Sequence, residues 1–141
     1  QRFSTSMISA VTNQGKVQFM IYCDTMNSDK FIEFLEQLIQ SSHKKIYVIL
    51  DNLRVHHSKP VKEWAEKNKK KIALFFLPSY SPEQNPDEYL NCDLKQGMSM
   101  KKSPKTKEKL QSNVQEHMQM LVESPERVKK YFKHKSIEYA A

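Results

Sequence analysis

The segment Val48-Ile49-Leu50-Asp51-Asn52 is an apolar run that ends abruptly in a carboxylate. Downstream lie Leu77-Pro78-Ser79-Tyr80-Ser81-Pro82 and then Asn85-Pro86-Asp87-Glu88. An apolar run of this length is typical of a buried strand, so Asp51 is expected at the tip of one. Glu88 follows Asp51 after 36 intervening residues, at the start of a predicted helix. Two carboxylates held on rigid elements are what a divalent metal site needs for phosphodiester chemistry.

Strands and helices alternate along the chain, which predicts an α/β fold. Two strands, Met7 to Thr12 and Val17 to Cys23, should form a hairpin. The run Ile46 to Leu50 should be a strand buried on both faces, as in parallel sheets, and Ile72 to Leu77 another buried strand. Helices are predicted over residues 28–40, 60–68, 86–95, 104–122 and 125–134, the third stopping near Gly97 and the last two starting at Ser103-Pro104 and Ser124-Pro125.

Composition favours one domain in a reducing compartment, which we take to be the cytoplasm. A chain of 141 residues can bury a core without disulfides, and its two cysteines are too few for a disulfide framework. No apolar run approaches the roughly 18 residues that span a bilayer, so no membrane partner is expected.

Positive charge is concentrated at one end of the chain. The net charge is +7; residues 1–98 carry 13 Lys and Arg against 11 Asp and Glu, whereas residues 99–141 carry 10 against 5. Such an excess favours a polyanionic partner through counterion release, although a solvated lysine-rich surface would look the same.

A series of short motifs, taken in order between about Ser6 and Met98, resembles the bacterial insertion-sequence transposases related to mariner, members of the DDE endonuclease superfamily. The motifs are Ile8-Ser9-Ala10-Val11, Thr25-Met26-Asn27, Asp51-Asn52, His56-His57-Ser58, Ser79-Tyr80-Ser81-Pro82 and Asn85-Pro86 with Glu88. The sequence departs from the family at Asn91 or Asp93, where tryptophan is common, and at Leu53, where a small residue is common.

The resemblance implies a ribonuclease-H-like mixed sheet flanked by helices, and makes Asp51 and Glu88 the second and third acids of a catalytic triad. The first acid would lie on a strand before Ser6, which this chain lacks. Because the sequence begins with Gln1, we interpret it as a C-terminal fragment: residues 1–98 form an incomplete catalytic core, and residues 99–141 form a basic helical extension of the same domain. The implied activity is cleavage and transfer of DNA strands with two Mg²⁺ or Mn²⁺ ions.

Each acid also has a structural interpretation. Asp51 could cap the turn after its strand. Glu88 could close a capping box with Asn85, and Asp87 competes with it as the ligand. Asp24, which also ends an apolar run, is a weaker substitute for the missing acid.

Other residues are candidates for contacts near the site. His56 and His57 could touch phosphate or a metal-bound water, or could pack in a loop. Asn52 is expected to hydrogen-bond near the acids. Candidate DNA contacts are Arg54, Tyr80, Lys95, Lys101 and Lys102.

Two other classes stay open: a decayed or repurposed fragment that binds nucleic acid without chemistry, and a structure-specific nuclease of the same fold. Without the central first strand, the neighbouring strands would expose unpaired edges. We therefore expect a homodimer in which a second copy supplies the missing pairing.

Overall fold

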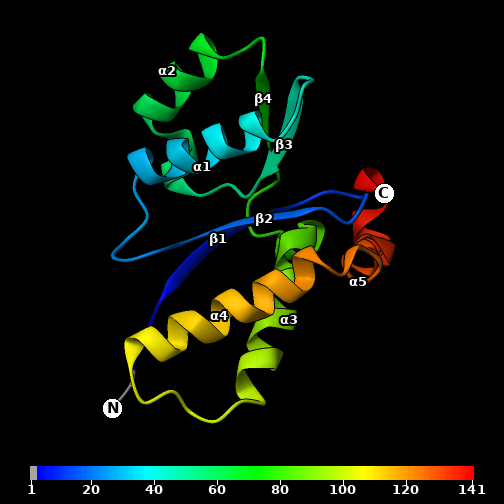
Figure 1. Cartoon of the computed structure of the whole chain (residues 1–141). Helices are drawn as coiled ribbons and strands as arrows, with labels where there is room; N and C mark the ends of the chain where they lie inside the picture. Colours follow the sequence, from blue (N-terminus) through cyan, green and yellow to red (C-terminus); the bar gives the residue numbers. More distant parts are fainter. Residues whose placement is uncertain (1–2) are drawn as a thin grey trace. The chain divides into compact units, whose positions relative to one another are not determined.

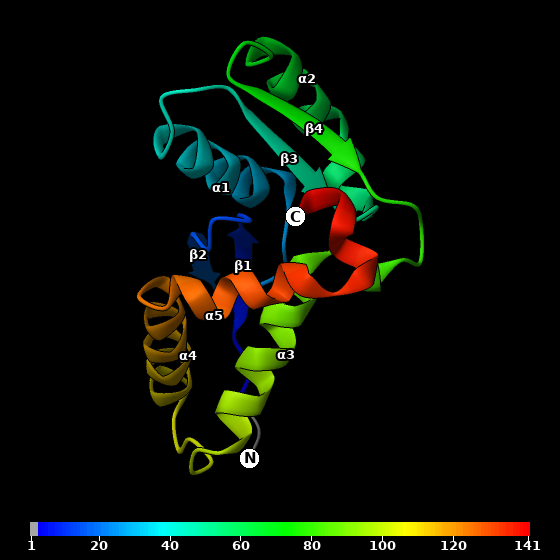
Figure 2. The same ribbon diagram turned by 90° about the vertical axis from the view of Figure 1, so that its right-hand side faces the viewer.

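The computed structural model describes residues 3–141, whose strands form two separate two-stranded sheets (Figures 1 and 2). The chain divides into two compact units. We call Thr25–Asn85 the sheet unit, and Gln1–Asp24 together with Pro86–Ala141 the helical unit.

The helical unit begins with the predicted hairpin. Strand β1 (Ser6–Val11) pairs antiparallel with β2 (Val17–Tyr22), so that Ser6 lies opposite Tyr22. In the turn, Gly15 has a φ of +86°, in the left-handed region that favours glycine. A Cβ atom at this position would collide with the backbone of Pro125, so the turn packs closely against the start of a later helix.

Three helices complete this unit: α3 (Pro86–Ser99), α4 (Lys107–Val122) and α5 (Pro125–Lys129), followed by the 3₁₀ turns Lys130–Lys133 and Lys135–Ala140. Helices α3 and α4 pack against each other (Figure 1). The buried core consists of Val17, Leu90, Val114, Met118, Leu121, Val128, Tyr131, Phe132 and Ile137. Burial of this apolar surface is the main source of the unit's stability.

Three predicted helix boundaries are wrong here. Helix α3 continues past Gly97 to Ser99. Gly97 serves close packing rather than helix termination, because a Cβ atom at this position would collide with the ring of His117. Helix α4 starts at Lys107, because Thr106 is its cap and accepts a hydrogen bond from the Lys109 amide at 3.0 Å. Helix α5 ends at Lys129, and 3₁₀ turns replace the rest of the helix predicted to residue 134.

The sheet unit holds α1 (Ser28–Gln40), β3 (Ile46–Leu50), α2 (Lys59–Lys67) and β4 (Ile72–Phe76), with 3₁₀ turns at Arg54–His57 and Pro82–Gln84. Strands β3 and β4 run parallel, from Ile46 opposite Ile72 to Leu50 opposite Phe76. The Leu77 amide donates to the Leu50 carbonyl at 2.8 Å, which extends the ladder by one bond. Both strands therefore end at the same edge, where Asp51 and Pro78 begin the next loops.

The buried side chains of this unit are Phe31, Phe34, Leu35, Leu38, Leu50, His56, Val61, Ile72 and Leu77. However, the expectation that β3 is buried on both faces is wrong. Tyr47 is 66% exposed, Ile49 is 41% exposed and Phe75 is 52% exposed. These residues share one face, since alternate residues of a strand point the same way and Ile49 is opposite Phe75. Helices α1 and α2 thus leave this face largely open to solvent.

Among the described residues, no helix combines the length and apolar character needed to cross a membrane.

Candidate active site

Asp51 lies directly after β3, as the apolar run before it predicted, and is half-buried. The side-chain amide of Asn85 donates a hydrogen bond to its Oδ1 atom at 2.8 Å. Asn85 follows the turn Pro82–Gln84 and directly precedes α3. The Asp51 and Asn85 motifs, far apart in the sequence, therefore meet at one carboxylate.

His56 supports the loop that carries Asp51. Its Nδ1 lies 2.7 Å from the Asp51 carbonyl oxygen and donates to it, since that oxygen can only accept. Its ring stacks on Phe31 with centroids 4.5 Å apart. Burial lowers the pKa of His56, despite the carbonyl contact and the negative charge of Asp51. These contacts favour the structural interpretation of His56 over contact with phosphate.

His57 belongs to a second line of contacts beside the acid. Its Nε2 hydrogen-bonds the side-chain oxygen of Asn52, and its ring stacks on Phe76 with centroids 4.0 Å apart. The amide nitrogen of Asn52 donates to the hydroxyl of Ser79 at 2.7 Å. The line His57–Asn52–Ser79 thus ties the loop after β3 to the loop after β4.

Glu88 lies in the first turn of α3, in the helical unit, and is half-buried. Its neighbour Asp87 accepts a hydrogen bond at 2.5 Å from the hydroxyl of Ser9 on β1. The choice of Glu88 rather than Asp87 as a ligand stays a prediction.

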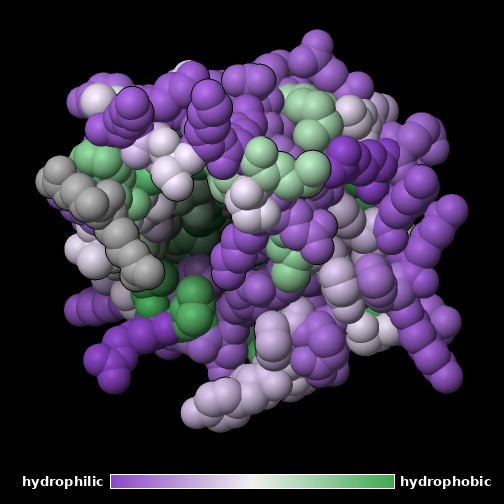
Figure 3. All heavy atoms as spheres, turned by 90° about the horizontal axis from the view of Figure 1, so that it is seen from below, coloured by the Kyte–Doolittle hydropathy of each residue, from purple (hydrophilic) through white to green (hydrophobic). Residues whose placement is uncertain are grey.

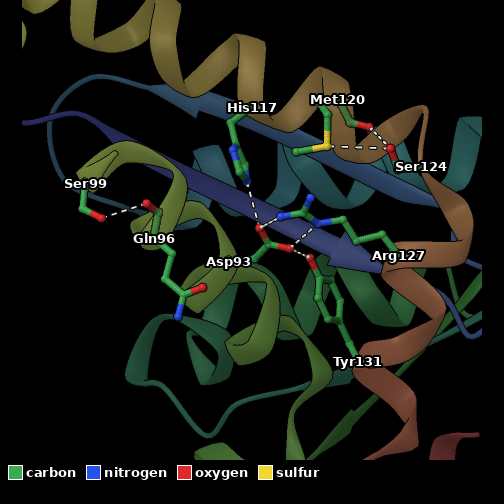
Figure 4. A network of polar contacts seen from close by, with 8 residues as sticks. All are labelled: Asp93, Gln96, Ser99, His117, Met120, Ser124, Arg127 and Tyr131. Atoms are coloured by element: carbon green, nitrogen blue, oxygen red, sulfur yellow. Dashed lines mark hydrogen bonds and ion pairs between the residues drawn. The ribbon is translucent and has the colours of Figure 1, made fainter. Parts of the chain in front are cut away.

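Further along α3, Asp93 joins three elements (Figure 4). Arg127 binds both carboxylate oxygens, with Nε 2.9 Å from Oδ2 and Nη2 2.6 Å from Oδ1. Tyr131 donates to Oδ2 at 2.5 Å, and His117 Nε2 donates to Oδ1 at 3.2 Å. The Asp93 side chain is only 11% exposed. The network therefore fixes the helix that carries Glu88.

The network also shifts the ionisation of its members. Burial pushes the pKa of Asp93 up, but hydrogen bonds from Arg127 and Tyr131 outweigh it and hold that pKa below its ordinary value. Burial and the hydrogen bond to Asp93 raise the pKa of Tyr131. Asp93 is therefore a structural anion at neutral pH.

The residues proposed to contact DNA differ in their exposure to solvent and in their ion pairs. Arg54, Lys95 and Lys102 are exposed, whereas Lys101 pairs with Glu116 at 3.5 Å. Tyr80 is fully exposed and has a φ of +57°, a conformation that is uncommon and strained for a non-glycine residue. Figure 3 shows a face of the molecule on which hydrophilic side chains predominate.

Asp24 likewise has a positive φ, +68°, just after β2, and it is exposed. This geometry is that of a turn residue, which agrees with the weaker place given to it as a substitute acid.

Within residues 3–141, no group of three or more His, Cys, Asp or Glu side chains is arranged to hold a metal ion. Asp51 belongs to the sheet unit and Glu88 to the helical unit, so their joint action as ligands stays a prediction.

The arrangement of elements is similar to that of known transposase catalytic domains. Mos1 transposase catalytic domain bound to raltegravir with Mg matches at a TM-score of 0.62 and 14% identity, over 96% of this chain and 81% of that one. The same domain with raltegravir and Mn matches at a TM-score of 0.62 and 14% identity, over 96% of this chain and 80% of that one. The Mos1 mariner catalytic domain matches at a TM-score of 0.60 and 13% identity, over 96% of this chain and 80% of that one. The fold is therefore ribonuclease-H-like, of the transposase type.

The family model described as "DDE superfamily endonuclease" matches residues 1–111. The chain belongs to this family. No curated protein matches it. The predicted fold and superfamily are confirmed, and origin in a bacterial insertion sequence stays a prediction.

Sequence reasoning missed three features. Asn85 was predicted only as a helix cap, and the hydrogen bond from its amide to Asp51 was not predicted. Asp93 was given no role beyond a departure from the family pattern, and Gly97 was read as a helix stop. Each of these contacts joins residues distant in sequence, so no local pattern indicates them.

Proposed function

We propose that this chain is the catalytic-domain part of a DDE transposase, acting in metal-dependent cleavage and transfer of DNA strands. The observation that carries the proposal is the family match over residues 1–111, within which Asp51 directly follows β3 and Glu88 lies in the first turn of α3. The solved Mos1 domains provide analogy for the metal, since two of them were determined with Mg or Mn.

In this proposal Asp51 and Glu88 supply carboxylate oxygens, the ligands that Mg²⁺ and Mn²⁺ prefer. None of the ion pairs within residues 25–85 involves Asp51. Divalent ions bound there would activate the attacking oxygen and stabilise the leaving oxygen of an in-line displacement. Two carboxylates leave such a site short of ligands, so weak binding is expected.

The reaction proposed for the complete enzyme has two displacements. Water attacks phosphorus at a transposon end, and the bond to the 3′ oxygen breaks as the new bond forms. The freed 3′ hydroxyl then attacks phosphorus in the target DNA, and the bond from that phosphorus to the 3′ oxygen of the target strand breaks, so that a target 3′ hydroxyl leaves. The protein would work on DNA in the cytoplasm.

Mn²⁺ binding to the full chain tests the metal part. Replacing Asp51 by Asn removes the charge but keeps the shape, and should weaken Mn²⁺ affinity by about tenfold or more. The exposed Asp29 in the first turn of α1 provides the matched control Asp29→Asn. Equal affinities in wild type and Asp51→Asn would leave only the non-catalytic alternative.

DNA binding by this chain should be electrostatic and tolerant of sequence. The support is the excess of ten basic over five acidic residues in residues 99–141, together with the exposed Lys102 and Lys95. Affinity should fall steeply with salt, with a logarithmic slope of about −0.9 per phosphate contacted. A salt-independent affinity, or no binding at low salt, would contradict this.

We further propose a homodimer formed through β3. Strand β3 has one hydrogen-bonded neighbour, β4, among the described strands. Antiparallel pairing of Ile46–Leu50 with itself about Val48 would place Tyr47 beside Ile49 of the second copy on the exposed apolar face. Light scattering after size exclusion should report a dimer, and Ile49→Lys should shift it to monomer. A clean wild-type monomer at high concentration would overturn this proposal.

A further inference from the structure

We infer that Asn85 is a positioning residue for Asp51: its amide fixes one oxygen of the carboxylate and leaves the other for a divalent cation. This inference rests on the proposed function, because it assigns Asn85 a task at the same metal site. The contact that carries it is the 2.8 Å hydrogen bond from Asn85 Nδ2 to Asp51 Oδ1, which is partly buried.

The contact is directional. Within residues 25–85 only Oδ1 of Asp51 accepts a side-chain hydrogen bond, while the backbone oxygen of the same residue is taken by His56. The Asp51 side chain is thus held through one oxygen and its peptide through another contact. Oδ2 keeps its lone pairs in a defined direction, as a pre-organised metal ligand requires.

The chemistry of an amide suits this position. A lysine or arginine would fix the carboxylate equally well, but its positive charge would oppose a cation bound to the same group. An amide N–H donates without carrying net charge. Asn85 therefore orients Asp51 without cancelling the charge that attracts the ion.

The backbone around Asn85 makes its side chain well placed. The residue has extended backbone angles, φ −105° and ψ 112°, between the turn Pro82–Gln84 and Pro86. Pro86 itself is buried and has a fixed φ, and a residue before proline is restricted to this extended region. The two prolines that flank the segment limit its freedom, so the amide is delivered to Asp51 at low entropic cost.

Asn68 provides a matched control. It lies at the C-terminal cap of α2, carries the same amide, and donates that amide to the Trp64 carbonyl at 2.8 Å rather than to Asp51. If Asn85 acts by orienting Asp51, removing its amide should affect metal binding far more than removing the amide of Asn68.

The experiment measures Mn²⁺ affinity of the full chain by electron paramagnetic resonance, for wild type, Asp51→Asn, Asn85→Ala, Asn68→Ala and the double variant Asp51→Asn/Asn85→Ala. We expect Asn85→Ala to weaken Mn²⁺ binding by about tenfold, the usual effect of losing a group that orients a ligand. Asn68→Ala should stay within about twofold of wild type. The double variant should bind no more weakly than Asp51→Asn alone, because Asn85 acts only through Asp51.

A second readout does not depend on metal. In amide nuclear magnetic resonance spectra, the side-chain NH₂ signals of Asn85 should move when Asp51 becomes Asn, because the carboxylate acceptor is lost. Urea unfolding of Asn85→Ala separates a loss of folding from a loss of orientation.

The outcomes are distinct. If Asp51→Asn weakens Mn²⁺ binding but folded Asn85→Ala does not, the inference is overturned and the proposed metal site stands. If Asp51→Asn has no effect, the metal site and the inference both fail. An additive loss in the double variant would show that Asn85 acts by another route and would also overturn the inference.

Discussion

Both compact units have fully buried side chains, but the units differ in how far their strands are exposed. Leu90 and Met118 in the helical unit are 0% exposed, as is Leu35 in the sheet unit, and no residue of β1 or β2 is exposed. In the sheet unit Tyr47 and Phe75 remain 66% and 52% exposed on one face of β3 and β4. Asp51 therefore directly follows a strand with one exposed face, whereas Glu88 lies on a helix fixed by core packing and by Asp93.

The greatest loss of stability is expected for a substitution in the core of the helical unit, and a much smaller loss for one on the exposed face of β3. Leu90→Ala should destabilise the protein by about 2–5 kcal/mol, because it opens a cavity in the core of the helical unit. Ile49→Ala, on the exposed face of β3, should cost less than about 1 kcal/mol. Urea unfolding followed by circular dichroism measures both. Similar losses for the two variants would contradict the contrast.

The second prediction concerns the stability that the Asp93 carboxylate on α3 contributes. Asp93→Asn should cost about 1–3 kcal/mol, since it weakens bonds to Arg127 and Tyr131 although Arg127 is half-exposed. The pKa of Asp93 is lowered in the folded state, so its stabilisation is present above the unfolded value of about 3.9 and is lost as pH falls through the folded value.

Unfolding free energies measured between about pH 5 and about pH 3 test this acid dependence. The wild type should lose more stability over this range than Asp93→Asn does. The exposed-site variant Asp29→Asn should keep the wild-type slope. Parallel curves for wild type and Asp93→Asn would mean that Asp93 ionises normally.

A smaller effect is expected at the loop after β4. Tyr80→Asn removes an exposed ring but keeps a residue type that tolerates positive φ, so stability should change by less than about 0.5 kcal/mol. Affinity for single-stranded DNA should fall by about 1 kcal/mol if the ring stacks on a base. Fluorescence anisotropy measures the affinity, and an unchanged value would remove Tyr80 from the DNA-binding surface.

Local sequence signals were sufficient to predict the position of several helices and strands. Strand β3 was predicted with its exact bounds, because Lys45 and Asp51 flank a continuous apolar run. Helix α1 was also predicted correctly over residues 28–40, and the structure adds Asn27 as its cap. Local signals of this kind determine where elements lie and place Asp51 at a strand end.

Contacts between distant residues could not be predicted in this way. Gly97 was read as a helix stop, yet its lack of a side chain serves the close approach of His117. The exposed face of β3 was missed because an apolar run indicates a strand without saying how many elements cover it. The bond between Asn85 and Asp51 spans 34 residues, and only the folded chain reveals it.

The shared metal site of Asp51 and Glu88 is a proposal that rests on the family match. It can be tested by titrating the isotope-labelled chain with Mn²⁺, because a bound paramagnetic ion broadens the amide signals of residues near it. Signals around Asp51 and around Glu88 should broaden together at the same Mn²⁺ concentration, and Glu88→Gln should reduce the broadening around Asp51. Broadening confined to one of the two acids, or unaffected around Asp51 by Glu88→Gln, would contradict it.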